Sequence, residues 1–488
     1  MLGVVGKRDV SRCAIASRQL RGRGRFVLAL FAAALLSCPA HAETLEQALA
    51  DAYLVNPVLN AERARLRAID EQVALAKSGL RPFVSGSYDT SFVNQNSDTT
   101  SANAFGFGAG GLTTDGITHP HGYAVQLSQP LFEGFQNLNA VRQAKAEVQS
   151  QRETLRATEQ SVLLDAATAY VNVVRDQAVV RLRENDVSVL AEQLKATRDR
   201  FDVGEVTRTD VAQAEARHAE ALATLAVAQA NLKSSRAAYE QIVGHPPGNL
   251  QTPPSIRHLL PQSLDEAMTL GDGENPIILS SVYSEEASLY AVEQIMGELL
   301  PEVTLEAQYE KRFDESQTVS EIETTTVTGR VNVPFYQGGG VSARVRQAKE
   351  TNNQLKREVE DARLRVHADV IANWGILQSS GPAISSAESA VKANKIALTG
   401  VREEEKVGQR TTLDVLDAQR ELLNSQIGLV SALRDRVVAE YSLYAAIGRM
   451  DAQTLGLSVP YYDPIEHYDI VKGKWFGLRP PPPPAADN

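Results

Sequence analysis

Cysteine is almost absent from this 488-residue chain: Cys13 and Cys38 are its two cysteines, and both lie in the first 42 residues. Beyond residue 42, no apolar run reaches the roughly 18 residues that a membrane-spanning helix needs. Aromatic residues are also scarce, at 6% against a hydrophobic content of 43%. These absences exclude disulfides and a helical membrane span after residue 42, and they favour helices that pack through small residues.

The first 42 residues have the pattern of a secretory signal peptide. A basic flank precedes an apolar run at 26–36, and Ala40, His41 and Ala42 form an A-x-A cleavage site. An alternative is a lipoprotein signal in which Cys38 becomes acylated. Cleavage after Ala42 would remove seven Lys/Arg and one Asp, which changes the net charge from −11 to about −17. So acidic a chain argues against nucleic-acid binding.

The rest of the chain is an internal duplication. The pentapeptide VRQAK at 141–145 recurs at 345–349, an offset of 204 residues. Because repeats at a fixed offset indicate copies of one structural unit, we predict a first copy at 43–250, a linker at 251–262 and a second copy at 263–448. Residues 449–488 are predicted to be an irregular, proline-rich, disordered tail that ends in the Pro480–Pro484 run.

Each copy has the same predicted order of elements: a short helical region, two strands and a long helical hairpin. Apolar and polar residues alternate in the strands, whereas the helical hairpins have apolar residues at spacings of three and four. Residues 93–121 are rich in Asn, Ser, Thr and Gly, and we predict a polar loop there. The predicted strand hairpins span 83–131 and 302–335, and the predicted helical hairpins span 138–243 and 341–447.

Four strands per chain are too few for a closed sheet. The smallest known membrane barrels have eight strands, and open edges are not tolerated in lipid. Three chains would supply 12 strands, enough to close a barrel. The last long helix has two adjacent apolar seams, one through Leu416 and Leu423 and one through Leu422 and Leu429, which predicts helical neighbours on both sides.

The turns at the tips of the helical hairpins contain the candidate functional residues. Gly204 and Gly408 are predicted left-handed helix caps. Asp210 and Asp414 each follow a threonine by three residues, which is the spacing of a capping box, so a purely structural role is an open alternative for both. Asp417 corresponds to Gln213 in the first copy, and no local structural role explains an aspartate at this position. We therefore predict that Asp414 and Asp417 together bind or filter cations.

With these features, the chain resembles the TolC-type family of outer-membrane efflux and type I secretion ducts. The resemblance covers nearly all of residues 44–448. It implies an α+β membrane protein in which a homotrimer forms a 12-stranded outer-membrane β-barrel, continuous with a periplasmic coiled-coil tunnel. It also implies passive conduction of drugs, toxic compounds or secreted proteins, together with a periplasmic adaptor and an inner-membrane translocase of the ABC or RND type.

The resemblance further implies a gate at the helix tips. Asp414 and Asp417 match an acidic entrance motif, and Arg410, Thr209 and Asp210 match positions that hold the tips shut through polar links. Glu405 departs from the family, which commonly has tyrosine there, and we expect its carboxylate to repel Asp210. A solvated turn arginine is the alternative role for Arg410.

Other classes of protein are disfavoured by the sequence. A lipid-anchored duct depends on Cys38, and a trimeric surface adhesin would lack the duplicated order of helices and strands. We predict no enzyme, because there is no nucleophile–base arrangement or phosphate loop, and no cofactor. His119 and His121 alone are too few ligands for a metal site. Four aromatic residues could form an interfacial belt or simply pack where strands meet helices: Phe132, Phe135, Phe335 and Tyr336.

Overall fold

The structure is a computed structural model that describes residues 43–100, 111–316 and 319–481. The predicted signal peptide, its cleavage site and Cys38 lie outside the described residues, as does most of the Pro480–Pro484 run. Glu43, the first described residue, pairs with Leu250 in an isolated parallel bridge. Among the described residues, no helix combines the length and apolarity required to cross a membrane.

Each copy begins with two helices separated by an Asn-Pro pair. Asn56 and Asn275 cap the second helix of each pair, because their Oδ1 atoms accept hydrogen bonds from Val58 N and Ile277 N, both at 2.9 Å. The following proline takes the first helical position, where a missing N–H costs nothing. The helices are α2 (Leu45–Val55), α3 (Pro57–Ser78), α6 (Leu264–Glu274) and α7 (Pro276–Gly297).

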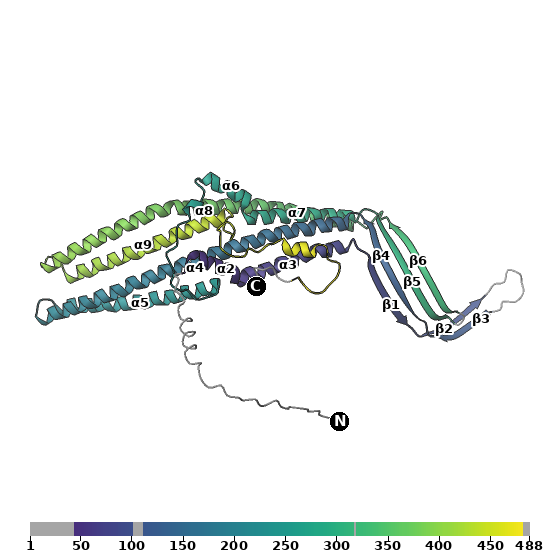
Figure 1. Ribbon diagram of the computed structural model, residues 1–488, viewed down its shortest axis with the longest axis horizontal. Helices are drawn as coiled ribbons and strands as arrows, with labels where there is room; N and C mark the ends of the chain where they lie inside the picture. The colour runs from purple at the N-terminus through teal and green to yellow at the C-terminus, as the bar shows by residue number, and fades with distance from the viewer. Residues whose placement is uncertain (1–42, 101–110, 317–318, 482–488) are drawn as a thin grey trace, which may run out of the picture. The chain divides into compact units, whose positions relative to one another are not determined.

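Four much longer helices form two antiparallel hairpins, which end together in Figure 1. They are α4 (Gln136–Asp202), α5 (Arg208–Val243), α8 (Gly340–Lys406) and α9 (Thr412–Ala446). The first helix of each hairpin has 67 residues, a length of roughly 100 Å at the rise of an α-helix. The hairpin tips are therefore far from the strands that precede α4 and α8.

The main sheet contains two strands from each copy, in the order β1-β4-β5-β6, with every pair antiparallel. The strands are β1 (Phe83–Thr90), β4 (His121–Glu133), β5 (Glu302–Ser316) and β6 (Val319–Asn332). In the described chain β1 and β6 each pair on one side only, so both edges of the sheet are open.

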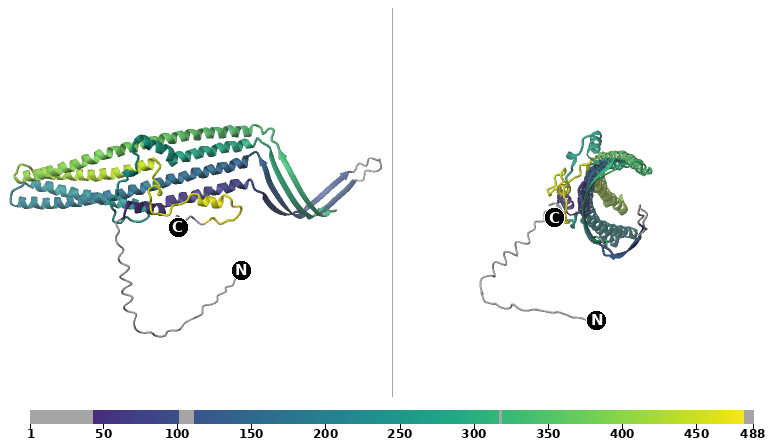
Figure 2. Two further views of the ribbon diagram at one scale, coloured as in Figure 1. Left: turned by 45° about the horizontal axis from the view of Figure 1, so that its top comes forward. Right: turned by 90° about the vertical axis from the view of Figure 1, so that its right-hand side faces the viewer.

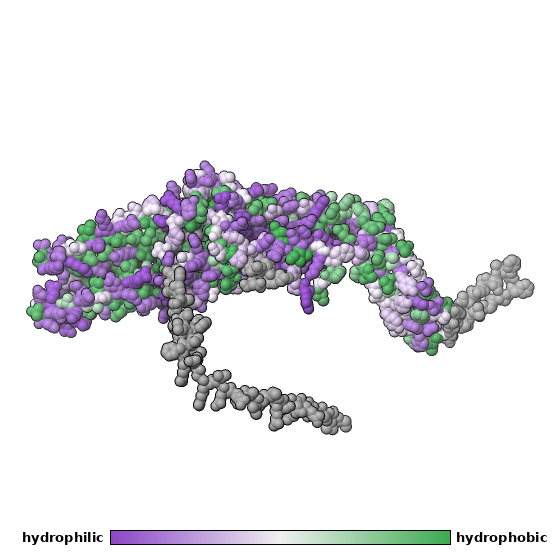
Figure 3. All heavy atoms as spheres, in the orientation of Figure 1, coloured by the Kyte–Doolittle hydropathy of each residue, from purple (hydrophilic) through white to green (hydrophobic). Residues whose placement is uncertain are grey.

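The two faces of this sheet differ in polarity. One cross-strand row is apolar and consists of Val84, Leu127, Ala307 and Val327. The next row, on the opposite face, is polar and consists of Ser85, Gln126, Gln308 and Thr326. Figure 3 shows apolar residues gathered where the strands leave the helices. An exposed apolar face opposite a polar face is the pattern of a sheet with lipid on one side and water on the other.

The prediction of a polar loop over 93–121 is wrong for most of that segment. Strands β2 (Val93–Thr100) and β3 (Gly111–Thr118) pair antiparallel as a separate two-stranded ladder, and residues 119–120 lead into β4. Both strands are rich in Thr, Asn, Ser and Asp, so they lack the apolar–polar alternation by which a strand is recognised. Backbone pairing joins the two strands in antiparallel register.

The main hydrophobic core lies midway along the helices, where the short helices and the linker pack against the long ones. It includes Leu49, Tyr170, Tyr239 and Tyr444, each at most 2% exposed. The buried carboxylate of Glu440 holds the linker, since it accepts hydrogen bonds from Ser255 Oγ and Ile256 N at 2.8 and 3.0 Å.

The disorder predicted after Gly448 is wrong for residues 449–481. This segment, called the C-terminal tail below, packs against the helices and includes a short helix, α10 (Glu466–Val471). Its apolar side chains Met450, Leu457 and Val471 are buried, but their irregular spacing produces no recognisable period. The tail (yellow in Figures 1 and 2) runs beside α3.

Candidate functional site at the helix tips

The two tip turns have the same backbone structure. Gly204 and Gly408 have φ angles of +80° and +76°, the left-handed conformation that the sequence predicts for both. Their N–H groups donate to Phe201 O and Glu405 O, both at 2.9 Å. A side chain at either position would strain the backbone, because left-handed φ angles disfavour residues with a Cβ atom.

The second helix of each hairpin begins with a capping box. Asp210 Oδ2 accepts hydrogen bonds from Thr207 N and Oγ1 at 2.8 and 2.7 Å. Asp414 Oδ2 accepts from Thr411 N and Oγ1, both at 2.9 Å. The hydrogen bonds from Thr207 lower the pKa of Asp210, and those from Thr411 lower the pKa of Asp414. Both aspartates therefore stabilise their own helices.

Glu405 lies between the two hairpins and is bonded to the first one. Its Oε1 atom is 2.9 Å from Nη1 of Arg200 on α4, and Thr412 Oγ1 donates to the same oxygen at 3.3 Å. The Glu405 side chain is 13% exposed. Arg200 also lowers the pKa of Asp210 through its charge, after the hydrogen bonds from Thr207. The repulsion expected between Glu405 and Asp210 is thus offset by the positive charge of Arg200, which acts on both carboxylates.

Asp417 makes a second link between the hairpins. Its Oδ1 atom is 3.0 Å from Nη2 of Arg217 on α5 and 3.4 Å from Nη2 of Arg420 on its own helix. The expectation that Asp417 has no local structural reason is therefore wrong. Two guanidinium groups oppose its charge, although its side chain is 44% exposed.

The remaining predicted gate residues are not brought together within one chain. Arg410 pairs through Nε with Glu404 Oε2 at 2.9 Å, inside its own hairpin, and both side chains are about half exposed. Thr209 is exposed, and Asp210 is engaged by its cap. A latch between Arg410 and the Thr209–Asp210 pair stays a prediction.

Sequence reasoning missed Arg200 and Arg217, which pair with acidic residues of the second hairpin near the tips. Arg217 follows Asp210 by seven residues, which is two helical turns along the same side, so its position was open to inference. Its pairing with Asp417 was not, because that depends on how α5 and α9 approach each other. The hairpins also meet through a small buried apolar cluster of Leu190, Ala221 and Leu416.

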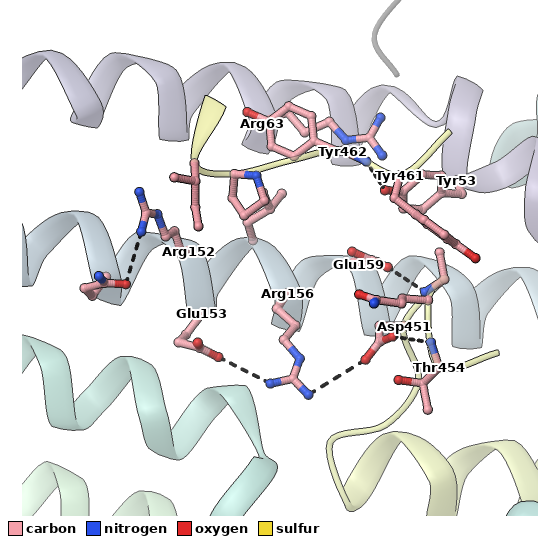
Figure 4. Close-up of a pocket in the computed structure, with 16 residues that line it drawn as sticks. Tyr53, Arg63, Arg152, Glu153, Arg156, Glu159, Asp451, Thr454, Tyr461 and Tyr462 are labelled. Atoms are coloured by element: carbon pink, nitrogen blue, oxygen red, sulfur yellow. Dashed lines mark hydrogen bonds and ion pairs between the residues drawn. The ribbon is translucent and has the colours of Figure 1, made fainter. Parts of the chain in front are cut away.

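A second group of polar residues lines a cavity of about 510 Å³ between α3, α4 and the C-terminal tail (Figure 4). Burial raises the pKa of Glu159 to about 7, and its Oε1 accepts a hydrogen bond from Ala452 N at 2.7 Å. Arg156 donates to Gly448 O at 2.9 Å and lies 3.8 Å from Asp451. These contacts attach the tail to α4. Over the described residues, no group of three or more acidic, His or Cys side chains could hold a metal ion.

Duplicated long helical hairpins, joined to a sheet with one apolar and one polar face, define the class of outer-membrane channel proteins. The sequence pattern of the family described as "Outer membrane efflux protein" matches residues 48–245 and 273–449. The chain belongs to this family. It is therefore a protein of the Gram-negative outer membrane that extends into the periplasm, and its family is a class of channels, not of enzymes.

Known relatives and structures agree with this assignment. The chain is 42% identical over 440 residues to the outer membrane efflux protein BepC of Brucella suis, covering 90% of this chain and 92% of BepC. It is 26% identical over 428 residues to the outer membrane protein TolC of Escherichia coli, covering 85% and 84%. The Campylobacter jejuni CmeC outer membrane channel has the same fold, with a TM-score of 0.73, 16% identity and coverage of 88% and 89%.

Proposed function

We propose that three copies of this chain form the exit duct of a tripartite efflux or type I secretion system. In this arrangement the sheets close into a 12-stranded barrel in the outer membrane, and the long helices of the repeats 43–250 and 263–448 form a periplasmic tunnel. The observation that supports closure is the sheet itself, with its open edges at β1 and β6 and its apolar face. An adaptor and an inner-membrane ABC or RND translocase supply the cargo, and conduction through the duct is passive.

The tip ion pairs support a gate at the periplasmic end. Arg200–Glu405 and Arg217–Asp417 both cross from the first hairpin to the second. Separation of the hairpins would break both pairs at once, so they stabilise the closed arrangement relative to an open one. We place the gate at these pairs, together with the exposed Arg410, which requires a neighbouring chain in order to meet Thr209 and Asp210.

The acidic residues at the tips give the entrance a second role. Asp414 and Asp417 lie one helical turn apart, and in a trimer they would form two rings of three carboxylates. Because Asp417 is paired with Arg217 and Arg420, cations bind these rings most strongly once the pairs have separated. Divalent-cation block of the channel in planar bilayers tests this role: Asp417→Ala should weaken the block, and an unchanged block would contradict the ring.

A charge exchange in planar bilayers tests the gate. Arg200→Glu alone should raise the open population, since it places two carboxylates together, and so should Glu405→Arg. The double variant, which restores an ion pair of reversed polarity, should return conductance toward that of the unchanged protein. Additive effects of the two substitutions would show that the pair does not hold the hairpins together.

Experiments in cells test the exit-duct function and its cargo. Deletion of the gene should increase sensitivity to toxic compounds, reduce the amount of secreted protein, or do both. Cross-linking from cysteines placed at exposed tip positions should capture a periplasmic adaptor. A deletion strain with unchanged sensitivity and secretion, and no cross-linked partner, would contradict the proposal.

A further inference from the structure

The last described part of the C-terminal tail is unlike the rest of this acidic chain. Residues 472–479, called the tail loop below, contain three basic residues and no acidic one. Its three large apolar side chains are exposed: Trp475 at 65%, Phe476 at 90% and Leu478 at 103%. Such side chains on one short loop form a surface that lacks a covering in the isolated chain.

The structure fixes where this loop lies. Lys77 Nζ on α3 donates to Lys472 O at 2.7 Å, and Arg81 Nη1 donates to Lys474 O at 2.7 Å. The Arg81 guanidinium also stacks over the Trp475 ring, 4.6 Å from its centroid. Arg81 is two residues before Phe83, the first residue of β1. The tail loop is therefore held beside the junction between the helices and the sheet.

A buried pair fixes the segment that leads into the loop. His467 Nδ1 on α10 is 3.0 Å from Asp70 Oδ2 on α3, and both side chains are almost fully buried. Val471 at the end of α10 is also buried. In the end-on view of Figure 2 the tail (yellow) lies on the convex side of the curved sheet and helices. On a closed trimer that side is the outside of the duct.

The tail loop adds to a group of cations at this junction, where the acidic residues Glu133 and Glu302 also lie. Five cations gather there: Lys77, Arg81, Lys472, Lys474 and Arg479. Asp469 pairs with Lys472 at 2.7 Å and neutralises one of them. Since the whole chain has a net charge of −11, a cluster of cations around exposed aromatic rings is complementary to an anionic, partly apolar surface.

We propose that the tail loop docks on the anionic phospholipid surface of the periplasmic leaflet of the outer membrane. The loop is continuous with the membrane-facing part of the protein, because the apolar row of the sheet begins at Val84, beside Arg81. At the opposite edge of the same junction, Phe335 and Tyr336 are 94% and 85% exposed. Aromatic rings flanked by Lys and Arg are typical of residues that lie at the headgroup level of a membrane.

The docked loop would tie α3 to the membrane from outside the duct. It would thereby fix the position of the helix–sheet junction relative to the membrane surface, independently of the barrel strands. This proposal rests on the outer-membrane location of the chain and on the closed trimer proposed above, and it makes no use of the tip gate. Loss of docking would leave the tip pairs intact, so lipid docking and the gate fail separately.

The two tryptophans of the chain, Trp374 and Trp475, provide the test. The full-length protein carrying Trp374→Phe is reconstituted into phosphatidylcholine vesicles with and without phosphatidylglycerol, using brominated lipids as quenchers. Trp475 fluorescence should be quenched, and about twofold more strongly when the vesicles are anionic, because each cation near such a surface adds to binding. In the Trp475→Phe protein the fluorescence comes from Trp374 in α8, and brominated lipids should quench it much less.

Charge variants separate lipid docking from other coverings. Substitution of Lys472, Lys474 and Arg479 by Gln should remove the preference for anionic vesicles. The matched control also removes three positive charges, by Lys→Gln changes on the tip halves of the long helices at Lys195, Lys392 and Lys395, and should have no effect. Quenching independent of lipid charge, or a Trp475 already shielded from iodide in lipid-free protein by a second copy of the chain, would overturn the proposal.

Discussion

The two helix tips of the chain have the same backbone structure but different charged residues. Both have a left-handed glycine and a Thr–Asp capping box at positions 204 residues apart. By contrast, Arg200 corresponds to Glu404, and Arg217 corresponds to Glu421. Each tip needs its own cap in order to form, so the local geometry is the same in both. Because the tips face each other, identical charges would repel, and the pairs that join them require the copies to differ.

Among these substitutions at the two tips, Arg200→Gln should change the ratio of open to closed channels most. It removes the cation that faces Glu405, whose carboxylate is mostly buried, and leaving such a group without its partner costs about 1–3 kcal/mol. We expect the ratio of open to closed channels to rise roughly tenfold, since 1.4 kcal/mol is one factor of ten. Open probability in planar bilayers measures this ratio.

Arg198→Gln is the matched control for that prediction. Arg198 also pairs with a glutamate, Glu215 at 2.6 Å, but within the first hairpin. Its loss should leave the open probability nearly unchanged. An equal effect from both substitutions would mean that the contact between the hairpins has no special role.

Removal of the N-cap hydroxyl should have a smaller effect, and it should destabilise the start of the second helix equally at both tips. Thr207→Ala and Thr411→Ala each remove an N-cap hydroxyl, a loss of about 1 kcal/mol from the start of the helix. Hydrogen exchange of the amides of Asp210 and Asp414, which donate to these hydroxyls, should accelerate to the same degree. Thr→Ser at either position should preserve protection. A large difference between the tips would show that the second tip depends on its interhelical pairs as well as on its cap.

The smallest effect on gating should come from Asp417→Asn. Its pair with Arg217 is exposed, at 44% and 26% for the two side chains, and exposed pairs contribute about 0.2–1 kcal/mol. The open population should rise no more than roughly fivefold by the same conversion. A double-mutant cycle with Arg217→Gln isolates the pair. Gln213→Ala, at the equivalent position of the first copy, should change nothing.

Local patterns could be predicted from the sequence, whereas contacts between distant segments could not. The long helices, the caps and the tip glycines each depend on residues within a few positions of one another. Glu405 was expected to repel Asp210, because nothing in its neighbourhood indicates that Arg200, 205 residues earlier, lies 2.9 Å away. The C-terminal tail was predicted to be disordered for the same reason, since its order depends on contacts such as Arg81 with Lys474, 393 residues apart.

The acid response of the two tips tests whether their caps are equivalent. Hydrogen bonds from the threonines lower the pKa of Asp210 and of Asp414 below the ordinary value of 3.8. A carboxyl whose pKa is lowered by folding stabilises the fold above its unfolded pKa, and this stabilisation is lost as the pH falls through the folded value. Amide protection at both tips, corrected for the intrinsic pH dependence of exchange, should therefore decline together below about pH 3.8. Asp210→Asn should abolish the decline at the first tip and leave it at the second, because each cap is bonded within its own hairpin. Loss of the decline at both tips would show instead that the caps are coupled through the Arg200–Glu405 pair.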